Sequence, residues 1–220
     1  MLLSMNVIEL FSSIDGEGKR QGFLTTFLRL HDCNIRCSYC DTLYSYGPES
    51  TFESMSVQAV ADVIEQLENH RITVTGGEPL LQEPAIIELI DELTRRNARY
   101  DFNIETNGTI IPSFHRDNVW FTYDYKTPSS LAEDAMNLDI FKVATPADII
   151  KFVVGSMQDL DRMDEILKTY PTDAQIFVSP VWGNIEGAMI IEYMKAHNWQ
   201  NVRFQLQIHK FIWDPDAKGV

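Results

Sequence analysis

Three cysteines lie within eight residues of this chain, in the order Cys33-x3-Cys37-x2-Cys40, and the chain has no other cysteine. Thiolates are the soft ligands that iron–sulfur clusters require, and three of them can hold three irons of a 4Fe-4S cluster. The remaining iron is then left for a ligand that is not a cysteine. The spacing therefore predicts a cluster with one open iron rather than a disulfide.

The same loop admits two other interpretations. His31 and the three cysteines together would satisfy the tetrahedral coordination of a structural zinc ion, as in a zinc-binding interaction module. The Cys37-x2-Cys40 pair could instead be a redox dithiol, although that motif leaves Cys33 unexplained. The cysteines alone leave these alternatives open.

Strand-like and helix-like segments alternate along the chain. β-Branched and apolar runs predict strands at 22–30, 71–75, 101–105, 119–124, 149–154, 175–179 and 202–207. Apolar residues at helical spacing predict helices at 57–67, 84–93, 157–169 and 185–196, with Ser54 or Ser56 capping the first and Pro84 opening the second. Such alternation is typical of an α/β fold with mostly parallel strands. We expect a partial or distorted (β/α) barrel, with an open doubly wound sheet as the alternative, and one domain over residues 1–220.

Polar side chains gather where these strands are predicted to end. The segments are 33–42, 76–79, 105–108, 124–126 and 207–210. Ligands of α/β folds bind at the carboxyl ends of the strands. The sequence therefore predicts one shared site.

The segment Thr75-Gly76-Gly77-Glu78-Pro79 is the most informative of these strand ends. Its glycines let the backbone approach a ligand closely, and its carbonyls or the Glu78 carboxylate can bind an ammonium group. A lone Gly-Gly is a turn in most sequences. Downstream of the cysteine loop, however, this GGEP resembles the amino-group motif of the radical S-adenosylmethionine (SAM) superfamily. The resemblance implies that SAM chelates the open iron and is cleaved by one electron to a 5′-deoxyadenosyl radical.

Further motifs resemble the 7-carboxy-7-deazaguanine synthase family, from about Val7 to Val220. They are Glu9–Gly18, Phe27–Arg29, Cys40–Thr42, Ile104–Gly108 and Gln207–Lys210. The resemblance implies a carbon–nitrogen lyase that converts 6-carboxy-5,6,7,8-tetrahydropterin to 7-carboxy-7-deazaguanine with loss of ammonia, a step towards queuosine, a tRNA modification. The alternative enzyme is a radical SAM activase that makes a glycyl radical in a partner protein.

The resemblance also implies a role for each matching residue. The cluster ligands would be Cys33, Cys37 and Cys40, and Thr42 would ligate Mg²⁺ beside the substrate carboxylate. The implied SAM-binding residues are Ser38, Tyr39, Cys40, Gly77, Glu78, Asp124, Tyr125 and Lys126. The implied substrate-binding residues are Ile14, Asp15, Gly16, Glu17, Arg29, Thr75, His209 and the C-terminal Val220. No side chain is assigned a certain catalytic role, since the radical arises on SAM.

Two positions depart from the family pattern. Asp15 stands where members often have Gln, which changes the edge of the pterin ring to which this side chain can hydrogen-bond. Tyr125 stands where Pro or a small residue is expected, which weakens the assignment of 124–126.

Charge and composition bear on partners. The net charge of −14 argues against a nucleic-acid surface, and residues 1–40 are neutral, with four basic and four acidic side chains. The cysteine region is thus favoured for a small anionic ligand, unless its cations lie there by chance. No signal peptide or membrane span is evident, so a cytoplasmic protein is expected. The resemblance adds a flavodoxin or ferredoxin as electron donor and a homodimer.

Overall fold

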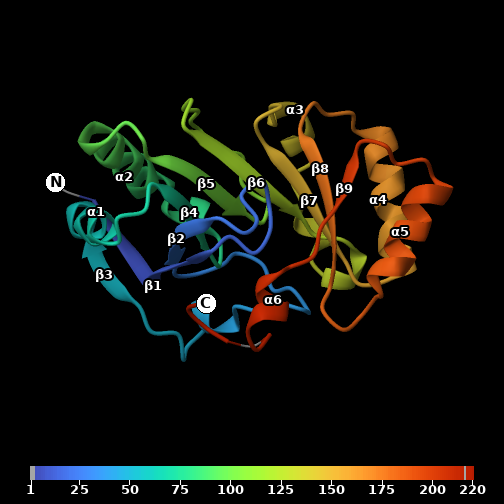
Figure 1. The fold of residues 1–220 in the computed structure, drawn as a ribbon, viewed down its shortest axis with the longest axis horizontal. Coiled ribbons are helices and arrows are strands. Elements are labelled where there is room, and N and C mark those ends of the chain that lie inside the picture. Colours follow the sequence, from blue (N-terminus) through green and yellow to red (C-terminus); the bar gives the residue numbers. More distant parts are fainter. Residues whose placement is uncertain (1–2, 216) are drawn as a thin grey trace.

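The computed structural model describes residues 3–215 and 217–220. Its strands form one nine-stranded sheet in the order β3-β1-β2-β4-β5-β6-β7-β8-β9. Strands β2 to β9 run parallel, whereas β1 pairs antiparallel with both β2 and β3. The sheet ends at β3 and β9 and does not close on itself, so the expected partial barrel is confirmed in an open form (Figure 1).

The strands have the following bounds: β1 Ser4–Ile14, β2 Leu24–Leu30, β3 Glu53–Ser56, β4 Arg71–Gly76, β5 Asp101–Thr106, β6 Val119–Tyr125, β7 Ile149–Val154, β8 Gln175–Pro180 and β9 Val202–Phe204. The sequence prediction missed β1 and β3, and it placed the end of β9 too late. These two missed strands form an antiparallel edge, which alternation of parallel β/α units does not predict.

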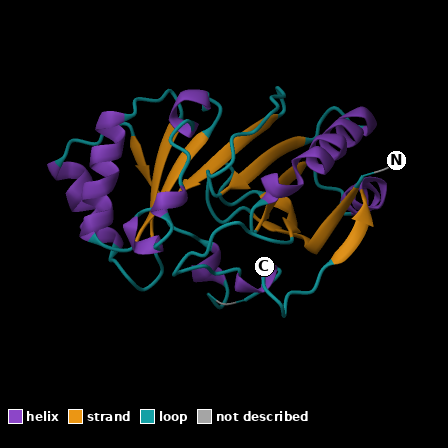
Figure 2. Ribbon diagram, turned by 180° about the vertical axis from the view of Figure 1, so that it is seen from behind, coloured by secondary structure: helices purple, strands orange, loops and turns teal. Residues whose placement is uncertain are grey.

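The helices are α1 Val57–Gln66, α2 Glu83–Arg96, α3 Ile140–Val143, α4 Met157–Thr169, α5 Gly187–Ala196 and α6 His209–Ile212, with short 3₁₀ turns at 43–45, 79–82, 128–130 and 133–135. The Ser56 side chain caps α1 by accepting from the Ala59 N–H at 3.2 Å, and Pro84 stands in the first turn of α2. Helices α1 and α2 lie at one end of the sheet and α4 and α5 at the other (Figures 1 and 2). In the described residues, no helix is long and apolar enough to cross a membrane.

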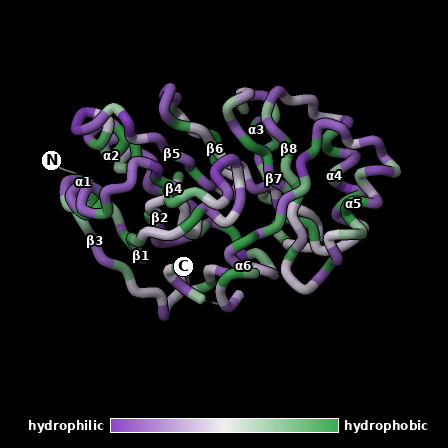
Figure 3. Tube along the Cα trace, in the orientation of Figure 1, coloured by the Kyte–Doolittle hydropathy of each residue, from purple (hydrophilic) through white to green (hydrophobic). Residues whose placement is uncertain are grey.

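The core lies between the sheet and these helices. All six residues of β7 are buried, and one side of each long helix packs against the sheet through residues such as Ile64, Leu89 and Met163. Figure 3 shows hydrophobic segments along β7 and β8 and hydrophilic segments in the outer loops. Because β2 and β4 to β8 are parallel, their carboxyl ends meet at one edge, and the loops after them face one another.

Candidate active site

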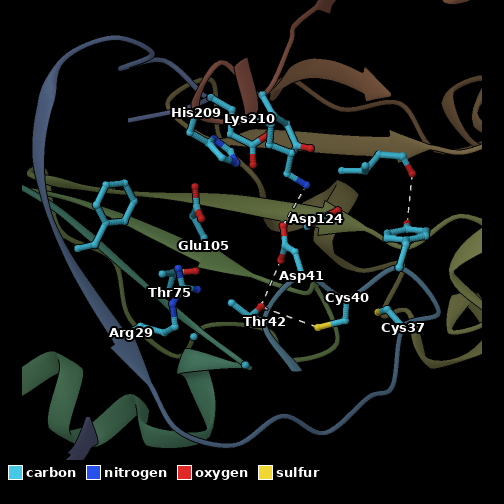
Figure 4. A pocket seen from close by; sticks show the side chains of 18 of the residues that line it. Arg29, Cys37, Cys40, Asp41, Thr42, Thr75, Glu105, Asp124, His209 and Lys210 are labelled. Atoms are coloured by element: carbon cyan, nitrogen blue, oxygen red, sulfur yellow. Dashed lines mark hydrogen bonds and ion pairs between the residues drawn. The ribbon is translucent and has the colours of Figure 1, made fainter. Parts of the chain in front are cut away.

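A cavity of about 260 Å³ opens at this edge of the sheet (Figure 4). It is walled by the carboxyl ends of the strands, by the cysteine loop and by the C-terminal segment. The predicted site residues that line it are Ile14, Asp15, Gly16, Glu17, Arg29, Cys33, Cys37, Tyr39, Cys40, Thr42, Thr75, Gly77, Asp124, Lys126, His209 and Val220. The structure therefore brings these predicted residues together in one cavity.

The cysteine loop follows β2 and brings three free, half-buried thiols to the cavity. The Asn107 side-chain amide lies 3.8 Å from Cys33 Sγ, and the Thr42 hydroxyl lies 3.8 Å from Cys40 Sγ. Burial raises the pKa of the Cys37 thiol to about 11, although the Lys126 ammonium group opposes that rise. Three thiols on one wall, with small polar donors beside two of them, fit an iron–sulfur cluster.

The zinc alternative fails on geometry. No group of three or more His, Cys, Asp or Glu side chains is placed to hold a metal ion, within the part of the chain that the structure describes. A zinc site needs four ligands that converge on one ion, whereas each thiolate of a cluster binds a different iron. His31, the required fourth zinc ligand, packs against Phe52 with ring centroids 4.3 Å apart and does not line the cavity.

Gly77 lets the chain pass very close to the cysteine loop. A Cβ at this position would collide with the backbone carbonyl of Asp32 and lie 2.8 Å from Cys33 Cβ. The Gly77 N–H also donates to the Leu30 carbonyl at 3.2 Å, so the loop after β4 is fixed against the end of β2. The glycine thus allows two ligand-binding loops to share one wall.

We expect Gly77→Ala to displace the cysteine loop. The added methyl meets backbone atoms, which cannot rotate away, so stability falls by about 1–3 kcal/mol and cluster content falls with it. Chemical denaturation and iron analysis of the purified variant measure the two effects. Gly183→Ala is the control for a loss of stability without crowding. Its φ of +77° strains an alanine, whereas a Cβ there meets nothing within 4 Å, so this variant should lose stability but keep its iron. A Gly77→Ala protein with full iron content would contradict this account.

Glu78 corrects one prediction, because its carboxylate does not line the cavity. The side chain is fully buried, and it accepts from the backbone N–H groups of Leu80 at 2.9 Å and Asn107 at 2.7 Å. The Thr106 hydroxyl lies 2.9 and 3.0 Å from its two oxygens. Burial raises the pKa of Glu78, while these hydrogen bonds act against the rise. The carboxylate ties the loop after β4 to the loop after β5 and leaves ligand contact there to the backbone.

Ser38 and Tyr125 also lie outside the cavity lining. Ser38 is exposed, and its hydroxyl donates to the Ser129 carbonyl at 2.5 Å. Tyr125 is buried, and its hydroxyl donates to Glu133 at 2.9 Å. Successive side chains of a strand point to opposite faces, so Asp124 can face the cavity only if Tyr125 faces the helices.

The predicted substrate side is held by ion pairs. The Arg20 Nε lies 3.1 Å from Asp15 Oδ2, which also accepts from the hydroxyls of Thr25 at 3.2 Å and Thr73 at 3.4 Å. Burial raises the pKa of Asp15, and Arg20 opposes it. Arg29 Nε lies 2.6 Å from Glu9 Oε1, which fixes the guanidinium at the cavity wall. Sequence reasoning missed Arg20 as the partner of Asp15.

The C-terminal segment covers the cavity from the other side. His209 was expected at a strand end but begins α6, since β9 stops at Phe204. The Ile208 N–H donates to the Gly16 carbonyl at 3.0 Å, and a Cβ on Gly16 would collide with the His209 ring. Lys210 Nζ lies 3.4 Å from Asp41 Oδ2 in the cysteine loop (Figure 4). These contacts hold His209 at the cavity, which Val220 also lines.

Among the charged residues of the cavity wall, Glu105 on β5 and Lys151 on β7 were not predicted as ligand-binding residues. Burial raises the pKa of Glu105 to about 7, which Lys151 opposes. A charged residue inside an otherwise apolar strand was the available signal: Lys151 interrupts Ile149–Val154, a run that is buried throughout. Glu105 begins the segment 105–108, in which the Asn-Gly pair already indicates a turn, so Glu105 itself was not singled out.

Comparisons with known proteins agree with this site. A family profile for the Radical SAM superfamily matches residues 29–153. The 7-carboxy-7-deazaguanine synthase of Clostridium acetobutylicum is 36% identical over 99% of this chain and 100% of its own length. The enzyme of that name from Leptospira interrogans is 36% identical over 99% of both chains. The crystal structure of QueE from Escherichia coli shares the fold, with a TM-score of 0.71, 23% identity and coverage of 92% of this chain and 93% of that one. The chain therefore belongs to the radical SAM superfamily and, within it, to the 7-carboxy-7-deazaguanine synthase family.

Proposed function

We propose that this radical SAM enzyme makes 7-carboxy-7-deazaguanine from 6-carboxy-5,6,7,8-tetrahydropterin with loss of ammonia. The observation that carries the proposal is the single cavity in which the three cluster cysteines, Gly77 and Arg29 all meet. Cys33, Cys37 and Cys40 would hold a 4Fe-4S cluster, which with SAM would supply the one-electron chemistry that removes a hydrogen atom from the substrate. The chain itself must bind both molecules and hold the reacting carbons next to each other.

The substrate carboxylate is assigned to Arg29. Its Nε is taken by Glu9, which leaves the two terminal nitrogens of the guanidinium fork for a bidentate contact. Thr42 lies beside Cys40 on the same wall, with its hydroxyl 3.3 Å from Asp41 Oδ1. We assign Thr42 to a Mg²⁺ ion beside that carboxylate, since Mg²⁺ takes few protein oxygens and keeps several waters.

Glu105 gives substrate binding a pH dependence. Burial raises the pKa of Glu105 to about 7. The positive charges of Lys151 and Arg29 oppose this rise, and the negative charges of Glu17 and Asp15 add to it. Only the ionised carboxylate accepts hydrogen bonds at both oxygens from pterin N–H groups. We therefore expect substrate affinity to fall about tenfold between about pH 8 and about pH 6.

Isothermal titration of the enzyme with the pterin across this range checks the expectation. Glu105→Gln is the matched variant, and it should bind weakly with a flat profile. Burial lowers the pKa of His209 from its ordinary value, which moves this second titrating group away from the pKa of about 7 of Glu105. A step near pH 7 that survives in Glu105→Gln would assign it to another group and contradict the prediction.

The wider assignments follow from the family. We propose that residues 1–220 act as one domain, that the enzyme is a cytoplasmic homodimer, and that a flavodoxin or ferredoxin supplies the electron. Its product would enter queuosine or another deazapurine pathway. Size-exclusion chromatography with light scattering tests the dimer.

Anaerobic turnover of 6-carboxy-5,6,7,8-tetrahydropterin with SAM, Mg²⁺ and reductant tests the activity. We expect 7-carboxy-7-deazaguanine to form, with SAM regenerated. Release of one free 5′-deoxyadenosine for each product would contradict the regeneration. Absence of product, together with activation of a glycyl-radical enzyme, would overturn the proposal in favour of the activase.

A further inference from the structure

Lys151 is a buried cation at the centre of the cavity wall. Its side chain is 6% exposed, and its Nζ lies 2.5 Å from Glu17 Oε1 and 3.6 Å from Asp124 Oδ2. Lys126 Nζ contacts the same Asp124 oxygen at 2.9 Å. The two carboxylates come from opposite parts of the site, Glu17 from the loop after β1 and Asp124 from β6. Lys151 therefore joins two walls of the cavity and does not merely fill the core.

Each of these carboxylates has one oxygen without a partner. Glu17 Oε2 and Asp124 Oδ1 are both buried, and neither has a hydrogen-bond partner among residues 3–215 and 217–220. Both cations near Asp124 contact Oδ2 and leave Oδ1 free of them. A buried acceptor without a donor is costly, so two such acceptors on one cavity wall point to donors that arrive with ligands.

The two acceptors lie towards different ligands. The Ser38 N–H donates to the Ser130 carbonyl at 2.9 Å, so the end of β6, where Asp124 lies, is next to the cysteine loop on the cluster side. Glu17 follows Gly16, which accepts from the Ile208 N–H and lies against the His209 ring, so Glu17 is on the proposed pterin side. A SAM ribose carries hydroxyl donors, and the pterin ring carries N–H donors.

We propose that Lys151 is a positioning residue that aims Asp124 Oδ1 at a SAM ribose hydroxyl and Glu17 Oε2 at a pterin N–H. The inference rests on the proposed function for the identity of the pterin. Two carboxylates and two ammonium groups make this cluster neutral, so the removal of Lys151 leaves one uncompensated negative charge in a buried place. Glu17 and Asp124 then repel each other, and both acceptors leave their positions.

Binding measurements test this without turnover. The cluster is reconstituted and kept oxidised, so that SAM stays intact, and SAM and the pterin are titrated separately by anaerobic calorimetry. Lys151→Met should weaken both ligands about tenfold or more, because each loses a positioned acceptor. Glu17→Gln should weaken only the pterin by that factor, and Asp124→Asn only SAM. Lys142→Met, which removes an exposed ion pair with Asp139, is the control and should change neither affinity.

The double variant Lys151→Met/Glu17→Gln separates positioning from packing. It removes one charge of each sign, so Asp124 regains its pairing with Lys126 alone. We expect its SAM affinity to return to within about threefold of the unmodified enzyme, while its pterin affinity stays low. A general packing defect would make the double variant at least as poor as Lys151→Met for SAM, and that result would overturn the inference.

Failure of the inference and failure of the proposed function give different results. If the unmodified enzyme converts the pterin but Lys151→Met binds both ligands within about twofold, only the inference is wrong. If the unmodified enzyme neither binds nor converts the pterin, the proposed function is wrong, and the SAM titrations still decide the role of Lys151 towards Asp124.

Discussion

Cys37→Ser should give a folded protein that is colourless, contains almost no iron and does not cleave SAM. A hydroxyl oxygen is a hard, weakly acidic ligand and replaces a thiolate poorly on an iron–sulfur cluster. The chain has no fourth cysteine that could take over the lost bond. We expect the rate of product formation to fall by on the order of 10⁶-fold or more, because the radical chemistry depends wholly on the cofactors.

The measurement combines iron analysis, electron paramagnetic resonance of the reduced protein and product formation. Cys37 is only half-buried, so the fold should survive, and circular dichroism of the variant should match that of the unmodified protein. Ser38→Ala is the neighbouring control, because the Ser38 side chain is directed to the Ser129 carbonyl and not to the cavity. A Cys37→Ser enzyme with full iron content would show that the cluster is held elsewhere.

The parallel part of the fold could be predicted from the sequence. Strands β2 and β4 to β8 are apolar runs bounded by polar turns, and the long helices show one apolar side, so their positions follow from local patterns. Strand β1 could not be found in this way, because its segment Ser4–Ile14 is mixed in polarity and its burial comes from pairing with β2 and β3. Such pairing depends on contacts with neighbouring strands and leaves no clear periodicity in the segment's own sequence.

The sequence indicated the residues that line the cavity better than the residues that hold them in place. Cysteine spacing and a Gly-Gly strand end predict groups that would meet a ligand directly, and the structure brings those groups to one cavity. The supporting contacts depend on which strands are neighbours. Lys151 is far in the sequence from Glu17, which it joins to Asp124 across the sheet, so no motif records it. Arg20 is only five residues from Asp15, but both lie in the irregular loop between β1 and β2, where no local pattern predicts the pair. Glu78 shows the reverse error, because a conspicuous motif residue proved to be one of the supports.

Glu78→Ala should be the most destabilising single change among the wall-forming loops. It removes a buried carboxylate that accepts from Leu80 N, Asn107 N and the Thr106 hydroxyl. These three donors would then be buried without partners, at a cost of about 1–3 kcal/mol each when nothing relaxes. We expect unfolding free energy to fall by about 3–5 kcal/mol, a size reached only when a buried polar network is broken.

The shape-conserving variant Glu78→Gln separates charge from geometry. Its amide keeps one acceptor oxygen but places an NH₂ group against a backbone N–H or the Thr106 hydroxyl, so we expect a loss of about 2 kcal/mol. Urea unfolding measures both losses, and SAM titration should show weaker binding in both variants, because the loops on either side of the missing bonds carry Gly77 and Asn107. If Glu78 bound the SAM ammonium group directly, Glu78→Gln would weaken SAM binding strongly while leaving the unfolding free energy of the SAM-free protein unchanged. That pattern would contradict the assignment of Glu78 as a supporting residue. If Glu78 bonds the two loops together, its loss must lower both the unfolding free energy and the SAM affinity.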